Sequence, residues 1–129
     1  MIVDTSFILD FLKDIEEAKS KIKQLVKENE PISIAAPTIF ELWTGVEALN
    51  KGDYEKNQIE QIIASQTIYG LDEESAEIAG KINGKLIRKG LTINPADCMI
   101  AGIAITNNQK VLTRDGHFKR IEGLKVESY

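Results

Sequence analysis

The chain has 129 residues, of which 43% are hydrophobic and 28% charged, a composition typical of a globular protein. We therefore expect one domain over residues 1–129, and the composition excludes a collagen-like fibre and a disordered tail. Sixteen basic and 20 acidic side chains give a net charge of −4, which argues against a polyanion partner unless some of the acids hold a cation.

Single residues exclude further classes. Cys98 is the one cysteine, so no disulfide forms within the chain, and with His117 as the one histidine a structural zinc site lacks ligands. The start, Met-Ile-Val-Asp4, has neither the basic residues nor the apolar stretch of a signal peptide. The longest apolar run, near residues 98–105, is too short to span a bilayer. We expect a cytoplasmic protein with no membrane association.

Short β-branched segments alternate with longer segments of helical periodicity. We predict strands, in chain order, at residues 2–3, 32–36, 67–69, 111–113 and 124–127. We predict helices over residues 6–29, from Pro37, from about residue 53 to Ser65, from Asp72 to about Lys89, and from Asn94 to Ala104. Strands separated mostly by helices indicate an α/β fold, with a mainly parallel five-stranded sheet covered by helices on both faces.

Four acids are predicted to lie at one edge of this sheet. Asp4 and Asp115 each follow a predicted strand, whereas Glu41 and Asp97 lie near the starts of helices. In such sheets the carboxyl ends of the strands and the starts of these helices share an edge, where sites form. Clustered carboxylates raise one another's pKa, and a divalent cation removes the repulsion. Oxygen ligands suit Mg²⁺ or Mn²⁺, which can activate water for phosphodiester hydrolysis.

Each acid also has an interpretation without catalysis. Asp4 can be a helix N-cap, Asp97 can close a capping box with Asn94, and Asp115 can belong to a turn. Glu41 can be an exposed helical acid, although its helical face contains only small or hydroxylated neighbours. That face can equally pack against another helix or subunit. Taken together, independent caps have no reason to converge on one edge.

Four motif stretches in order resemble those of the PIN domain, and the compact length resembles VapC-type toxins of toxin–antitoxin pairs. They are Met-Ile-Val-Asp4-Thr5-Ser6, Glu41, Asp97-Cys-Met-Ile-Ala-Gly-Ile-Ala, and Thr113-Arg-Asp115-Gly-His-Phe. The resemblance implies a Rossmann-like α/β/α sandwich and a Mg²⁺- or Mn²⁺-dependent endoribonuclease that cleaves RNA. Its metal ligands and catalytic acids correspond to Asp4, Glu41, Asp97 and Asp115, and its supporting hydroxyls to Thr5 or Ser6 and to Thr113.

The resemblance also implies partners. Members of the family usually form homodimers, and a cognate antitoxin protein inhibits them by laying a peptide over the acidic site. Apolar positions around Trp43 suggest an exposed surface for such a dimer. The third motif begins Asn94-Pro95-Ala96, where many members have a further acid, so a second metal position is expected to be weaker.

Arg114 and Lys119 lie near the predicted site and are the candidates for contact with an RNA phosphate. A second basic group falls on one helical face and is better explained as a solvated face; it comprises Lys81, Lys85, Arg88 and Lys89. The competing hypothesis is a catalytically silent protein-binding module in which the acids serve only as caps. A metal-dependent phosphatase or deoxyribonuclease could use the same acids.

Overall fold

The computed structural model describes every residue from Met1 to Tyr129. Its centre is a five-stranded sheet in the order β3-β2-β1-β4-β5. The strands are β1 Ile2–Val3, β2 Ser33–Ala35, β3 Thr67–Tyr69, β4 Val111–Leu112 and β5 Val126–Glu127. All four strand pairings are parallel, so the predicted sheet is confirmed and no antiparallel strand interrupts it.

Six α-helices and one 3₁₀ helix connect the strands. They are α1 Thr5–Leu12, α2 Glu16–Lys27, α3 Ala36–Ala48, α4 Asp53–Ser65, α5 Glu73–Arg88, α6 Pro95–Thr106 and η1 Gly116–Arg120. The single helix predicted over residues 6–29 is wrong, because Asp14 adopts a left-handed φ of 57° and ends α1. None of the helices combines the length and apolar character needed to cross a bilayer.

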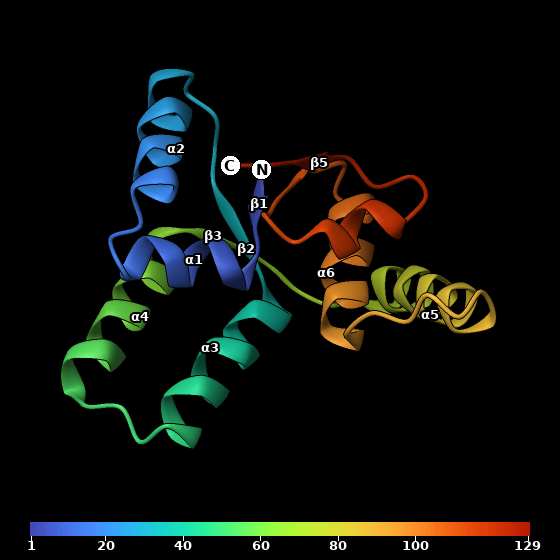
Figure 1. Ribbon diagram of the computed structural model, residues 1–129, viewed down its shortest axis with the longest axis horizontal. Coiled ribbons are helices and arrows are strands. Elements are labelled where there is room, and N and C mark those ends of the chain that lie inside the picture. The colour runs from blue at the N-terminus through green and yellow to red at the C-terminus, as the bar shows by residue number, and fades with distance from the viewer.

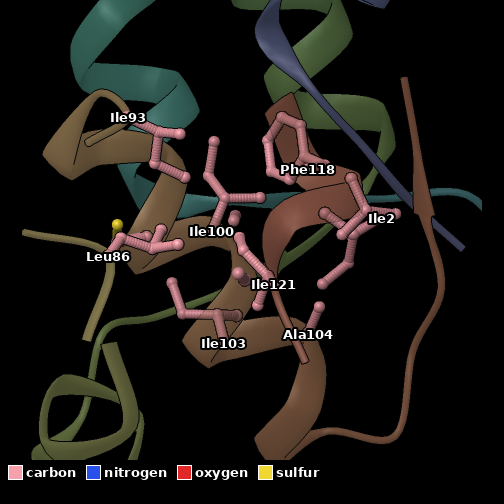
Figure 2. Close-up of a cluster of buried hydrophobic side chains, with 12 residues drawn as sticks. Ile2, Leu86, Ile93, Ile100, Ile103, Ala104, Phe118 and Ile121 are labelled. Atoms are coloured by element: carbon pink, nitrogen blue, oxygen red, sulfur yellow. The ribbon is translucent and has the colours of Figure 1, made fainter. Parts of the chain in front are cut away.

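The sheet separates two helical layers. Figure 1 shows α1 to α4 on one side of the strands and α5 and α6 on the other. Alternate strand residues point into opposite cores, since Ile2 and Val111 pack with α5 and α6 whereas Val3 and Leu112 pack with α1 to α4. Figure 2 shows the first of these cores, in which Ile100 of α6 lies beside Phe118 of η1 and Ile103 lies further along the same helix. This is the α/β/α sandwich that the sequence indicates.

Helices α5 and α6 approach each other closely at Gly102. A Cβ atom on Gly102 would lie 2.5 Å from the backbone oxygen of Ser75, so only glycine fits there without a shift of the backbone. Asp72 caps α5 as predicted, in a capping box with the Ser75 backbone and hydroxyl groups. The contact fixes α6, and with it the start of that helix, against α5.

Of the apolar positions expected to be exposed around Trp43, Phe40 is exposed and Trp43 itself is not. Trp43 is half-buried and packs against the core between the sheet and α1 to α4. The exposed apolar side chain on this helix is Phe40, with 70% of its surface accessible. With three apolar residues among four in Phe-Glu-Leu-Trp, the sequence does not show which of them face the core. Phe40 and Trp43 are three positions apart on a helix with 3.6 residues per turn, so one can be exposed while the other is half-buried.

Candidate active site

Asp4 stands at the point where β1 passes into α1. It is the N-cap of α1, and its carboxylate accepts a hydrogen bond from the Phe7 backbone N–H at 2.9 Å. The Ser6 hydroxyl donates to the same carboxylate at 2.8 Å, and the Thr113 hydroxyl donates to it from the end of the neighbouring strand β4. Burial raises the pKa of Asp4, although these hydrogen bonds oppose the rise. The capping interpretation is therefore correct for Asp4, and it does not compete with a place in the site.

Glu41 projects from the second turn of α3. The Thr5 hydroxyl donates to Glu41 Oε1 at 2.7 Å and lies 3.4 Å from the hydroxyl oxygen of Thr38, which is fully buried one turn earlier in α3. The two hydroxyls that follow Asp4 thus orient different acids, since Thr5 binds Glu41 and Ser6 binds Asp4. The sequence left this choice open, and the structure uses both.

Asp115 follows β4 and caps η1. Its carboxylate accepts the His117 backbone N–H at 2.9 Å, and Nδ1 of the same histidine lies 3.2 Å away. The Asp115 backbone N–H in turn donates to the Thr113 hydroxyl at 2.9 Å. Because Thr113 also donates to Asp4, one buried threonine connects the ends of β1 and β4. These two strands are neighbours in the sheet, at the position where its strand order reverses.

Asp97 lies in the first turn of α6 and completes the group. Its pKa is raised to about 7, first by burial and then by the negative charges of Glu41, Asp115 and Asp4. This response to all three other acids indicates that the four carboxylates share one site. As they stand, the side chains do not form a compact set of three or more metal ligands. Hydroxyl or backbone donors orient Asp4, Glu41 and Asp115 separately.

The basic residues have different surroundings from those expected. The Arg114 guanidinium forms an ion pair with Asp10, with 2.8 Å between Nη1 and Oδ2, while 58% of its side chain stays exposed. Lys119 is exposed in η1. In the helical basic group on α5, Lys81 pairs with Glu77 and Lys89 with Glu122. Arg114 is therefore the cation that the structure holds in a defined place beside Thr113 and Asp115.

Sequence reasoning missed two residues next to the site. Asp10 is 97% buried in α1, and its Oδ2 accepts a hydrogen bond from the Tyr129 hydroxyl at 2.9 Å. A signal for Asp10 was present, since it is the one acid in the apolar run Phe-Ile-Leu-Asp-Phe-Leu. No local pattern identifies Tyr129, because its contact with Asp10 spans 119 positions.

Comparison with known proteins defines the family. The PIN domain family model matches residues 1–124, and the chain belongs to this family. It is 31% identical to the tRNA(fMet)-specific endonuclease VapC of Salmonella typhimurium over 97 residues, which cover 74% of each chain. It is 30% identical to Ribonuclease VapC1 of Methanocaldococcus jannaschii, over 98% of this chain and 85% of that relative.

A solved structure agrees with the fold. VapBC2 from Rickettsia felis, bound to a DNA fragment from its promoter, superposes with a TM-score of 0.88 and 25% identity, covering 99% of this chain and 97% of that chain. VapC-type proteins are therefore the members of the PIN family that this chain resembles over nearly its whole length.

Proposed function

We propose that this chain is a Mg²⁺- or Mn²⁺-dependent endoribonuclease, the toxin of a toxin–antitoxin pair, acting in the cytoplasm. The observation that carries the proposal is the meeting of four acids at the carboxyl edge of the sheet, where hydroxyl groups orient Asp4 and Glu41. Burial and the other three acids together raise the pKa of Asp97 there. A fold has no structural need for four acids that repel one another. Such an arrangement is typical of a site that binds a cation.

The donor set fits a hard divalent ion. Asp4, Glu41, Asp97 and Asp115 offer carboxylate oxygens, and Thr113 contributes a hydroxyl, whereas sulfur is absent from the group. A bound Mg²⁺ or Mn²⁺ would supply Lewis acidity, lowering the pKa of water and stabilising charge that develops on the phosphate. The charge of the bound cation would also offset part of the net charge of −4, which weakens the electrostatic opposition to RNA.

The chain's own residues orient the ligands and the substrate. Thr113 and Ser6 hold the Asp4 carboxylate, and Thr5 holds that of Glu41, so hydroxyls fix the direction of two of the four acids. Arg114 and Lys119 supply positive charge beside Asp115 for an RNA phosphate. The names of the relatives, an endonuclease specific for a tRNA and a ribonuclease, favour RNA over the phosphatase and deoxyribonuclease alternatives.

Two surfaces suit the proposed protein partners. An apolar groove of 540 Å³ beside the starts of α3 and α6 is lined by Phe40, Leu71 and Met99, all exposed, and we assign it to a second copy in a homodimer. A second apolar groove, of 270 Å³, lies among α1, α2 and α4 and includes Phe11 and Val26. The solved relative is a toxin–antitoxin complex, and we assign this groove to an apolar segment of an antitoxin.

Cleavage of a structured RNA pool tests the activity. The purified protein is assayed with Mn²⁺, with a chelator, and as the variants Asp97→Asn and Asp53→Asn. Asp53 is an exposed acid in the first turn of α4 and is the matched control for a first-turn acid. We expect Mn²⁺-dependent cleavage that Asp97→Asn abolishes and Asp53→Asn retains. Cleavage that survives in Asp97→Asn would show that the site is misassigned.

Metal binding separates the proposal from a catalytically silent binding module. Isothermal titration with Mn²⁺ should give binding to the wild type and at least tenfold weaker binding to Asp97→Asn. If the wild type binds no Mn²⁺ and cleaves no RNA, the acids act only as caps and the binding module is the better explanation. Binding without cleavage would retain the metal site and exclude this RNA pool as substrate.

A further inference from the structure

Asp10 is a buried carboxylate outside the four-acid group. It lies on the face of α1 that also carries Ser6, one turn away, and only 3% of its surface is exposed. One of its oxygens, Oδ2, receives both the Arg114 guanidinium at 2.8 Å and the Tyr129 hydroxyl at 2.9 Å. Residues from three segments far apart in the sequence, Asp10, Arg114 and Tyr129, thus meet at Asp10 Oδ2.

One of these segments is also held by an apolar contact that does not involve the charge of Asp10. The ring of Tyr129 already packs edge-on against Phe7, with 4.7 Å between ring centroids. Burying a carboxylate costs free energy, and well-packed apolar residues commonly stabilise a protein as much as a buried ion pair does. A buried acid in the apolar helix α1 therefore suggests a role other than stabilising the fold. The charged group that Asp10 contacts is Arg114.

Arg114 is positioned to use this support. It lies between Thr113 and Asp115, two residues of the proposed site, yet its guanidinium is directed to Asp10. A guanidinium has five N–H donors, and the Asp10 contact engages Nη1 only. With 58% of the side chain exposed, other donors remain accessible to a ligand. Arginine binds phosphate through such paired donors, with a geometry that lysine lacks.

We propose that Asp10 is a positioning residue, which fixes Arg114 at the rim of the four-acid site as a clamp for an RNA phosphate. The inference rests on the proposed ribonuclease function. It adds that the Asp10 carboxylate determines the position of the Arg114 guanidinium. Asp10 also gives the guanidinium a partner outside the site. Without it, Arg114 would be free to turn toward the neighbouring carboxylates and would lose its fixed orientation toward the substrate.

Steady-state cleavage of an RNA oligonucleotide in Mn²⁺, at several KCl concentrations, tests the assignment. The variants are Asp10→Asn, Arg114→Gln, both together, and Glu127→Gln as the matched acid-to-amide control. Glu127 pairs with Lys21 and ties α2 to β5, so its loss reports a purely structural ion pair. We expect Asp10→Asn and Arg114→Gln each to raise KM about tenfold, equal to about 1.4 kcal/mol, the scale of one hydrogen bond to a charged group.

The proposal leads to two further predictions that a purely structural role of Asp10 would not. The double variant should have the KM of Arg114→Gln alone, because Asp10 acts through Arg114. The slope of log KM against log KCl should become shallower by about one in Arg114→Gln, as for the loss of one phosphate contact. Glu127→Gln should leave both KM and slope at wild-type values, and Arg114→Lys should restore part of the affinity.

Each contrary result is distinguishable. If Asp10→Asn lowers the thermal midpoint but leaves KM and the salt slope unchanged, Asp10 is only a structural tie. If Asp10→Asn does not fold, a wild-type KM in Arg114→Gln overturns the proposal by itself. Additive effects in the double variant would also overturn it. A wild type that cleaves no RNA in Mn²⁺ refutes the ribonuclease function itself, and the clamp with it.

Discussion

Replacing Asp97 by Asn should stabilise the metal-free protein at alkaline pH. The pKa of Asp97 is about 7 in the folded chain against an ordinary value of 3.8, so the folded state holds a proton that the unfolded state has already released. Between these two values the free energy of unfolding must fall as the pH rises. Above pH 7 the cost of the ionised carboxylate is fully present, and Asp97→Asn removes it.

The size of the effect follows from the two pKa values. At 1.36 kcal/mol per pKa unit, their separation corresponds to at most about 4 kcal/mol. Asp97 is only partly buried, so solvent screening reduces this to roughly 1–2 kcal/mol. The dipole of α6 favours the charge in its first turn by about 0.3–1 kcal/mol, which subtracts from the gain. A net stabilisation of about 1 kcal/mol corresponds to a rise in Tm of roughly 4 °C for a chain of this size.

Thermal unfolding in a chelator at pH 8 and at pH 3.5 measures this effect. The variant should melt roughly 4 °C above the wild type at pH 8. The difference should nearly disappear at pH 3.5, where Asp97 is protonated in the folded chain and mostly protonated in the unfolded chain. Asp53→Asn, at an exposed first-turn position of α4, should show no gain at either pH. An Asp97→Asn protein no more stable than the wild type at pH 8 would contradict the account of four interacting carboxylates.

Three other substitutions have defined outcomes. Gly102→Ala should lower the free energy of unfolding by about 1–3 kcal/mol in urea titrations, because its Cβ would meet the Ser75 backbone oxygen. Thr5→Val should lower kcat for RNA cleavage by roughly tenfold, because the hydrogen bond to Glu41 is lost, whereas Thr5→Ser should retain most of the wild-type kcat. Equal rates for the two variants would exclude an orienting role of the hydroxyl. Phe40→Glu should convert a homodimer into a monomer in sedimentation velocity, and an unchanged sedimentation coefficient would place the dimer on another face.

The fold could be predicted because its elements alternate. Strands of two or three residues gave weak signals singly, but their separation by helices indicated a parallel sheet. The acids could be placed on one edge for the same reason, since Asp4 and Asp115 end strands and Asp97 begins a helix. The break at Asp14 could not be predicted, because a single left-handed residue hardly disturbs an apolar periodicity that continues beyond it.

Other features could not be predicted because they depend on contacts between residues far apart in the sequence. The partner of Arg114 is an acid more than a hundred positions away, and no spacing rule reports which surface cation meets a buried carboxylate. Burial of single side chains was equally hidden, as Phe40 and Trp43 show. The chemical type of the site residues was readable from the sequence, whereas the hydrogen bonds that orient them required the tertiary structure.

The central position of β1 has a consequence for biosynthesis. Strand β1 lies between β2 and β4, and Asp4 becomes part of the site only when Thr113, 109 positions later in the chain, arrives beside it with Asp115. The whole segment from Asp4 to Asp115 must therefore leave the ribosome before the four acids meet, and pairing of strands so distant in sequence is slow. A nascent or truncated chain that ends before β4 carries no assembled site.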